Sequence, residues 1–316
     1  MKKILLSLSM IGAVAIVAVG ATGAFFSDTE TSTGNTFTAG AIDLGVDNES
    51  YYNGHANAGT SWDLDFDIDT TEFSGDNQAT TEVENGYSLP IVRQFFNFLD
   101  LKPGDYGEDT ISIHVNNNPS WLCADVRLVT NDDATCNEPE NDVEGTNCAL
   151  GSEPDNDFAD GDLAQNIDFL WWNDDGDNVL EIGEQTLSAG LLGNLGVGNT
   201  ARVALVDSDE NIFGTQGQPF PGATTEYIGK AWCFGDISAL PLLQSSAFPN
   251  VRATTTPAQD GDGNGTAGQP TDGGYTCSGA SSLNNASQTD STTLDIGFRA
   301  VQSRNNVGFQ CQTPLP

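Results

Sequence analysis

The feature that constrains this fold most is a strict two-residue alternation of apolar and polar side chains. In residues 61–69, four aspartates alternate with Trp62, Leu64, Phe66 and Ile68. Successive side chains of a β-strand point to opposite faces, so the pattern predicts a half-buried strand. Its aspartate face suits a solvated surface, and a cation ladder or a charged edge strand are the alternatives. Amphipathic helical runs are scarce and glycine is abundant, so we expect an all-β protein.

Two further alternating segments allow the buried face to be predicted. In residues 110–115 the inward side chains are Ile111, Ile113 and Val115, which leaves His114 on the polar face. In residues 291–301 the inward side chains are Leu294, Ile296, Phe298 and Ala300. Strand-like runs also cover residues 121–129, 167–172, 201–206 and 226–234.

The first 24 residues have the composition of a secretory signal peptide. Lys2 and Lys3 precede an apolar run from Ile4 to Gly20, and small residues follow. We expect cleavage between Ala24 and Phe25. An uncleaved anchor is the alternative, although the run is at the short limit for a membrane span.

Residues 25–46 are predicted to form an arm and a first strand. Ile42, Leu44 and Val46 alternate with polar or small residues, whereas Phe37 belongs to an alternation of opposite phase. A bulge at the intervening glycine accounts for the change of phase. Residues 27–36 carry no apolar side chain that could hold them to a core, so Phe25 and Phe26 would lie at the tip of a flexible arm or of a frayed terminus.

Several motifs of the chain resemble the TasA/camelysin family. These are Phe25-Phe26-Ser27-Asp28, residues 35–44 with the pattern Thr-Phe-x-x-Gly-x-hydrophobic-Asp-Leu, Leu101-Lys102-Pro103-Gly104-Asp105, and residues 288–304. The resemblance implies processing by a SipW-type signal peptidase and a jelly-roll-like β-sandwich. It also implies assembly of identical subunits into extracellular fibres, in which the N-terminal segment of one completes a sheet of the next. The donor-strand residues would be Phe25, Phe26, Phe37, Ile42 and Leu44.

The charge of the chain excludes some partners and favours others. Its formal net charge is −35, with 45 acidic against 10 basic residues, and beyond the signal segment Lys102 and Lys230 are the lysines. A surface of this kind does not bind nucleic acid. Most of the acids are aspartate, which favours turns and divalent cations, although a well-solvated surface would have a similar composition.

The six cysteines of an exported chain predict disulfides rather than thiols or zinc ligands. Spacing suggests that Cys136 pairs with Cys148 and Cys277 with Cys311, which leaves Cys123 for Cys233. Other pairings of the six remain open at this point.

A calcium-loop pattern follows the run that ends at Trp172. Asn173, Asp175, Asp177, Val179, Glu181 and Glu184 fall at its liganding positions, and Val179 would contribute its carbonyl. Asn178 replaces the usual glycine and would need a left-handed backbone, which asparagine tolerates. No flanking helices are evident, so we predict an EF-like loop on a β scaffold, with an acidic turn as the alternative. A stretch from Asp260 begins like a second calcium loop but has Thr271 in place of the closing glutamate. We predict a surface loop there.

The sequence contains few features that indicate an enzyme. The sequence has no zinc-protease, nucleophile-elbow or phosphate-loop motif, and His55 lies far from His114. A camelysin-like secreted peptidase, which would need a dispersed triad, is one alternative to a structural protein. A carbohydrate-binding β-sandwich adhesin using Trp62, Trp171 or Trp172 is another, although tryptophans in apolar runs are more often core.

We therefore expect a secreted, extracellular or cell-surface structural subunit, not an enzyme, whose mature form does not span a membrane. The signal peptide would be 1–24, the arm and first strand 25–46, and a single β-sandwich domain 47–316. Long acidic loop insertions would lie near 131–165 and 254–285. Calcium would be its cofactor.

Overall fold

A computed structural model describes most of the β-rich part of the chain. The described residues are 27–31, 44–61, 81–84, 87–90, 95–96, 98, 100–116, 118–133, 135–144, 159–243, 257–279 and 285–312. For 27–31, 81–84 and 87–90 it describes the backbone alone. The predicted signal peptide, the strand at 62–69 and the donor residues Phe25, Phe26, Phe37 and Ile42 lie outside this set.

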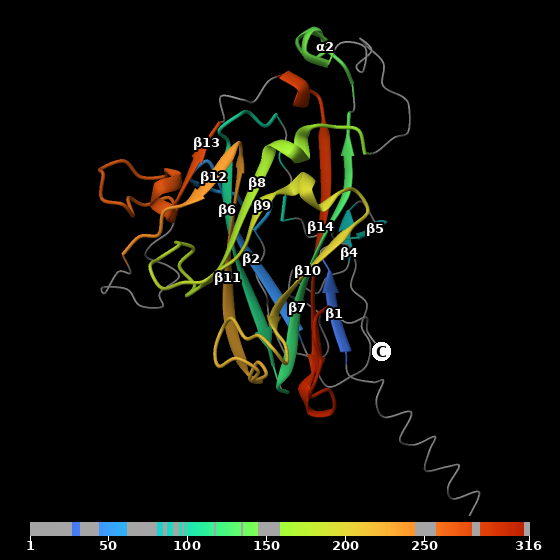
Figure 1. Ribbon diagram of the computed structural model, residues 1–316, viewed down its shortest axis with the longest axis vertical. Helices are drawn as coiled ribbons and strands as arrows, with labels where there is room; N and C mark the ends of the chain where they lie inside the picture. The colour runs from blue at the N-terminus through green and yellow to red at the C-terminus, as the bar shows by residue number, and fades with distance from the viewer. Residues whose placement is uncertain are drawn as a thin grey trace, which may run out of the picture.

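Two antiparallel sheets form an all-β sandwich (Figure 1). One sheet has the order β1 (Ser27–Thr31), β14 (Ser291–Gln302), β7 (Ser120–Asp132), β10 (Thr200–Val206). The other has the order β3 (His55–Ala56), β2 (Leu44–Tyr52), β6 (Tyr106–Val115), β11 (Thr224–Phe234), β8 (Ile167–Asp174), β9 (Thr186–Leu191). Two small pairs are β4 (Thr81–Glu84) with β5 (Tyr87–Pro90), and β12 (Asp236–Ala239) with β13 (Tyr275–Ser278).

In the described part of the chain, helical structure occurs as short pieces. The α-helix α2 is Glu138–Glu144, and 3₁₀ turns are η2 (Leu163–Asn166), η3 (Leu192–Leu195), η4 (Pro270–Gly273), η5 (Asn285–Ser287) and η6 (Ser303–Asn305). Helix α2 lies within the acidic excursion after β7, where the sequence shows no clear periodicity. No helix among the described residues is long and apolar enough to cross a membrane.

The predicted inward faces form the main core between the sheets. Ile111, Ile113 and Val115 of β6 are buried, and so are Ile296 and Phe298 of β14. Leu44 is 2 % exposed at the start of β2, opposite Val115 of β6. The alternation therefore predicted both the strands and their buried faces, because the pleat sends every second side chain to the same side.

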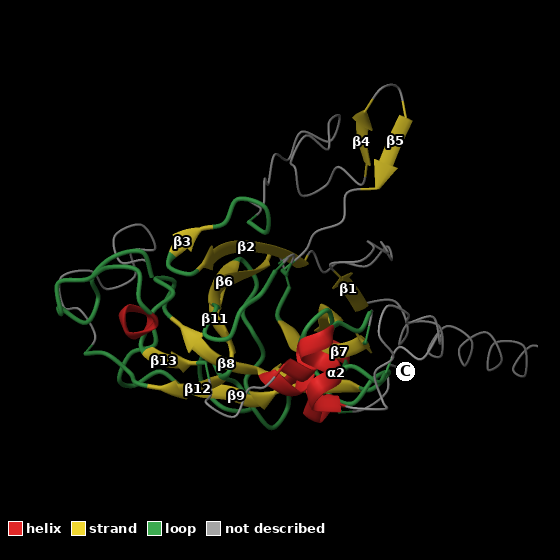
Figure 2. Cartoon of the chain, turned by 90° about the horizontal axis from the view of Figure 1, so that it is seen from above, coloured by secondary structure: helices red, strands yellow, loops and turns green. Residues whose placement is uncertain are grey.

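A smaller apolar cluster covers the outer face of the six-stranded sheet. Trp172 of β8 is fully buried there beside Leu180 of the following loop and Tyr275 of β13. Gly229 of β11 lies opposite Trp172, and a Cβ atom at Gly229 would be 2.0 Å from the indole. Glycine therefore lets the indole lie across the strand. Figure 2 shows β12 and β13 beside β8.

The disulfide pairing predicted from spacing is wrong for four cysteines. The structure joins Cys123 to Cys311 and Cys233 to Cys277, both with Cα atoms 5.6 Å apart. Cys123 and Cys233 each have another partner, so the predicted bond between them does not form. Cys136 is disulfide-bonded, and its predicted partner, Cys148, lies outside the described residues.

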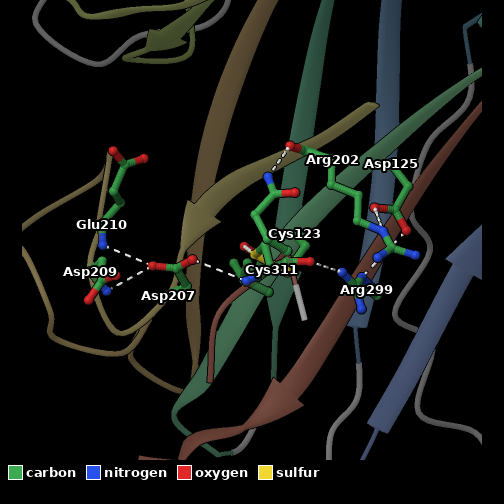
Figure 3. The surroundings of a disulfide bond; sticks show 10 residues. Cys123, Asp125, Arg202, Asp207, Asp209, Glu210, Arg299 and Cys311 are labelled. Atoms are coloured by element: carbon green, nitrogen blue, oxygen red, sulfur yellow. Dashed lines mark hydrogen bonds and ion pairs between the residues drawn. A yellow bond between two sulfur atoms is a disulfide. The ribbon is translucent and has the colours of Figure 1, made fainter. Parts of the chain in front are cut away.

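The two disulfides attach segments that are distant in sequence to the main sheets, with Cys277 of β13 joined to Cys233 of β11. Cys311 follows β14 in the chain and returns to β7, where its sulfur meets Cys123 (Figure 3). The backbone N–H of Cys311 donates to Asp207 at 3.1 Å, and its carbonyl accepts from Arg299 at 2.6 Å. Spacing along the chain does not reveal such returns, because they depend on which segment covers which face.

Candidate metal centre

The loop between β8 and β9 gathers several carboxylates beside the outer apolar cluster. Leu180 anchors it, being 1 % exposed within the outer cluster, and its N–H donates to the carbonyl of Gly273 at 2.9 Å. The N–H of Ile182 donates to the carbonyl of Leu242 at 2.8 Å. The loop is thus held from two sides by segments distant in sequence.

Three of the predicted ligands meet in this loop. Oxygens of Asp175, Asp177 and Glu181 lie within 4.8 Å of one another, and Asp177 and Glu181 are each 3 % exposed. Asn178 has φ +64°, which confirms the left-handed backbone predicted for it. Hard carboxylate oxygens at this spacing could hold a metal ion.

The other three predicted ligands are placed differently. The amide of Asn173 donates to the carbonyl of Ile212 at 2.9 Å, away from the cluster. The Glu184 carboxylate accepts the N–H groups of Asp175 and Glu181, at 3.0 and 2.8 Å, and so closes the loop. Val179 lies inside the loop with its N–H on Asp177 Oδ1 at 3.0 Å.

Asp174 organises the loop, although the calcium pattern does not include it. It ends β8 at 3 % exposure and accepts from Trp172 Nε1 at 3.1 Å and from the N–H groups of Gly176 and Asn178. An aspartate that accepts hydrogen bonds from residues further along the chain is typical of turns. The acidic turn thus coexists with the carboxylate cluster, and Asp174 rather than Asn173 shapes the start of the loop.

Burial and crowding raise the pKa values of two groups in the loop. Burial, together with the charge of Asp177, raises the pKa of Asp174 to about 7. Burial, followed by the charge of Asp174, raises the pKa of Glu184 to about 9. Desolvation disfavours the charged form of a carboxylate, and neighbouring carboxylates add to the effect. A bound divalent cation would reverse this preference, since it stabilises the ionised forms.

Two more acidic clusters occur among the described residues. Asp133, Glu140 and Asp290 come from the end of β7, α2 and the residue before β14, and they could also hold a metal ion. Nothing local in the sequence indicates this second group, because its members meet through tertiary structure. The third group is Asp260, Asp262 and Asp272.

The third group fits the surface-loop prediction. Asp272 is fully buried, and its carboxylate accepts N–H groups of Gly261 at 2.9 Å and Gln269 at 2.8 Å. Asp260 and Asp262 are exposed. The buried carboxylate therefore shapes the turn through backbone hydrogen bonds.

His114 takes part in a polar row across the outer face of the six-stranded sheet. Its Nε2 lies 3.0 Å from Asp47 Oδ2 and its Nδ1 lies 2.8 Å from Thr225 Oγ1. This order resembles a hydroxyl–imidazole–carboxylate relay. Thr225 is the second residue of β11 and lies directly opposite His114 of β6, so the row is a contact between neighbouring strands of one sheet.

The tryptophans considered as sugar platforms are core residues where they are described. Trp171 is 5 % exposed and Trp172 is fully buried. Trp62 lies outside the described residues.

No protein-family model matches the chain. No curated protein matches its sequence either.

Proposed function

We propose that this chain is a secreted subunit that polymerises into extracellular fibres by exchange of its N-terminal strand. The observation that carries the proposal is β1. Residues Ser27–Thr31 form an edge strand of the four-stranded sheet and pair antiparallel with β14, from Ser27 opposite Val301 to Thr31 opposite Gly297.

Strand β1 is suited to exchange because its sequence contains polar residues only, Ser-Asp-Thr-Glu-Thr. Its attachment to β14 therefore relies on the backbone ladder. The same segment of a neighbouring copy would present the same donors and acceptors, so replacing one by the other conserves the hydrogen bonds. The resemblance to fibre-forming proteins gives this exchange a biological setting, and the disulfides suit an oxidising compartment.

A cysteine pair at the end of the β1–β14 register distinguishes exchange from self-pairing. In a Thr31→Cys, Gly297→Cys double variant, exchange would link successive chains, and non-reducing gels of assembled material would show a ladder removed by reductant. Self-pairing would join the cysteines within one chain, and only monomers would appear. Each single variant controls for scrambling with the six native cysteines.

Deletion of residues 25–36 from the mature protein provides a second test. The truncated chain should fold, keep its β circular dichroism and remain monomeric in negative-stain microscopy. Fibres of normal length from this variant would contradict strand donation.

We further infer that the β8–β9 loop binds calcium, with Asp175, Asp177 and Glu181 as ligands. The support is the convergence of three carboxylates, which suits a hard cation, and the left-handed Asn178 that a calcium loop requires at this position. Calcium would then stabilise the end of the Trp172 strand within each subunit.

The secreted-peptidase alternative comes from the resemblance to camelysin, and the Thr225–His114–Asp47 row is its candidate triad among the described residues. The three side chains come from neighbouring strands of one sheet, which suits a structural contact between strands, and we keep the non-enzymatic interpretation as the proposal.

A further inference from the structure

The two sheets enclose a lysine. Lys230 of β11 is 0 % exposed and faces the interior of the sandwich. It lies directly opposite Asp109 of β6, which is 1 % exposed, and its Nζ is 2.8 Å from Asp109 Oδ2. The ring centroids of Phe96 and Phe95 are 3.7 and 4.9 Å from the same nitrogen.

Burial changes the chemistry of this amine. Desolvation lowers the pKa of Lys230, against the opposing effect of the Asp109 carboxylate. Enclosing two charges costs several kcal/mol that their attraction does not always offset, so burial favours the neutral amine of Lys230. A neutral amine is a nucleophile, whereas an ammonium ion is not.

The exposed pair formed by Lys102 and Asp100 provides the contrast. Its Nζ and Oδ2 atoms are 2.6 Å apart, but the side chains are 66 % and 86 % exposed. Water stabilises both charges there, so the amine stays protonated. The two pairs have the same functional groups at similar distances and differ in burial.

Asn48 of β2 orients the acceptor carboxyl of Asp109. Its amide Nδ2 donates to Asp109 Oδ1 at 3.1 Å and to the carbonyl of Thr60 at 2.8 Å. The hydrogen bond to Thr60 fixes the amide of Asn48. The other hydrogen bond is therefore directed at Asp109 Oδ1, the oxygen that would gain negative charge when the amine attacks Cγ. A fixed donor at such an oxygen stabilises a tetrahedral intermediate.

We propose that Lys230 and Asp109 condense to an amide, a covalent cross-link between β6 and β11. A proton passes from Nζ to Oδ2, which leaves an amine and a carboxylic acid. The Nζ lone pair then forms a bond to Cγ, the Cγ–Oδ2 bond breaks, and Oδ2 departs as water with a second proton from Nζ. Oδ1 remains as the amide carbonyl and keeps the hydrogen bond from Asn48. The reaction consumes no oxidant and no external reagent.

Folding itself would drive this step. The register holds the two groups opposite each other at a high effective concentration. The link would join strands of one sheet that are far apart in the chain. It does not depend on the fibre proposal, since it forms within a single subunit.

Intact mass spectrometry of the secreted protein, after reduction of its disulfides, tests the proposal. The wild type should be one water lighter than the mass of its mature sequence. Lys230→Met and Asp109→Ala should each show the full sequence mass, and Lys102→Met should retain the deficit. A wild type at full sequence mass would show a permanent ion pair and overturn the inference, whether or not the variants fold.

Peptide mapping locates the lost water. Digestion should yield two peptides joined through Asp109 and Lys230, and amine labelling in denaturant should modify Lys102 but not Lys230. Water loss confined to one linear peptide would indicate cyclisation of an aspartate and would also overturn the proposal.

Discussion

The carboxylates of the β8–β9 loop should make stability depend on pH and on calcium together. The folded pKa of Glu184, about 9, lies above its ordinary value of 4.5, and that of Asp174, about 7, lies above 3.8. The folded state therefore holds protons that the unfolded chain has released between those values. Without metal, stability should be highest in mild acid and decline as the pH rises from about 4 towards 9.

The size of this effect follows from the shifts. One pKa unit corresponds to about 1.4 kcal/mol, so Glu184 alone would cost up to roughly 3 kcal/mol at pH 7, less whatever solvent screening removes. A native-state ligand at a hundred times its Kd returns about 2.7 kcal/mol. Calcium should therefore offset a large part of the penalty at neutral pH and have less effect in acid, where protons compete with it.

The assay is the melting temperature of the purified protein from pH 4 to pH 9, with calcium or with chelator. Asp177→Asn and Glu181→Gln should abolish the calcium-dependent rise at neutral pH. Asp236→Asn and Glu210→Gln are matched controls at exposed positions and should preserve it. Glu184→Gln should also reduce the rise, through loss of a loop-closing acceptor. Equal stabilisation of the wild type and of Asp177→Asn would mean nonspecific neutralisation of an acidic surface, and the site would be refuted.

Three other outcomes are expected. Cys123→Ser should destabilise the protein by roughly 1 kcal/mol more than Cys233→Ser in urea titrations, because its disulfide spans 188 rather than 44 residues and restricts the unfolded chain more; a larger loss for Cys233→Ser would contradict this entropic account. Gly229→Ala should lower the urea midpoint by the equivalent of about 1–3 kcal/mol, because the added methyl group meets the buried Trp172; an unchanged midpoint would show that the indole moves freely. Thr225→Val should leave any peptide hydrolysis by the secreted protein unchanged, and a loss of turnover with the fold intact would favour the peptidase alternative.

Local sequence determined the strands and their faces. Ile111, Ile113 and Val115 could be assigned inward from their alternation alone, since the period of a strand depends only on the backbone. The left-handed backbone at Asn178 was also predictable from local sequence, because few residue types adopt this conformation and asparagine is one of them. Membership of the carboxylate cluster was predictable only in part. The calcium-loop pattern gives the positions of the carboxylates along the chain but not the direction in which each side chain points.

Tertiary structure alone decided the remaining features. Cys311 meets Cys123, and Cys277 meets Cys233, because particular segments return to particular sheets. Asp109 and Lys230 come together for a similar reason, since the register of β6 against β11 places them opposite each other. An alternating pattern shows that a strand has a buried face, but pairing between strands is a long-range choice made by the packing of the whole sandwich. The chemistry of a buried group therefore depends on neighbours that its own stretch of sequence does not contain.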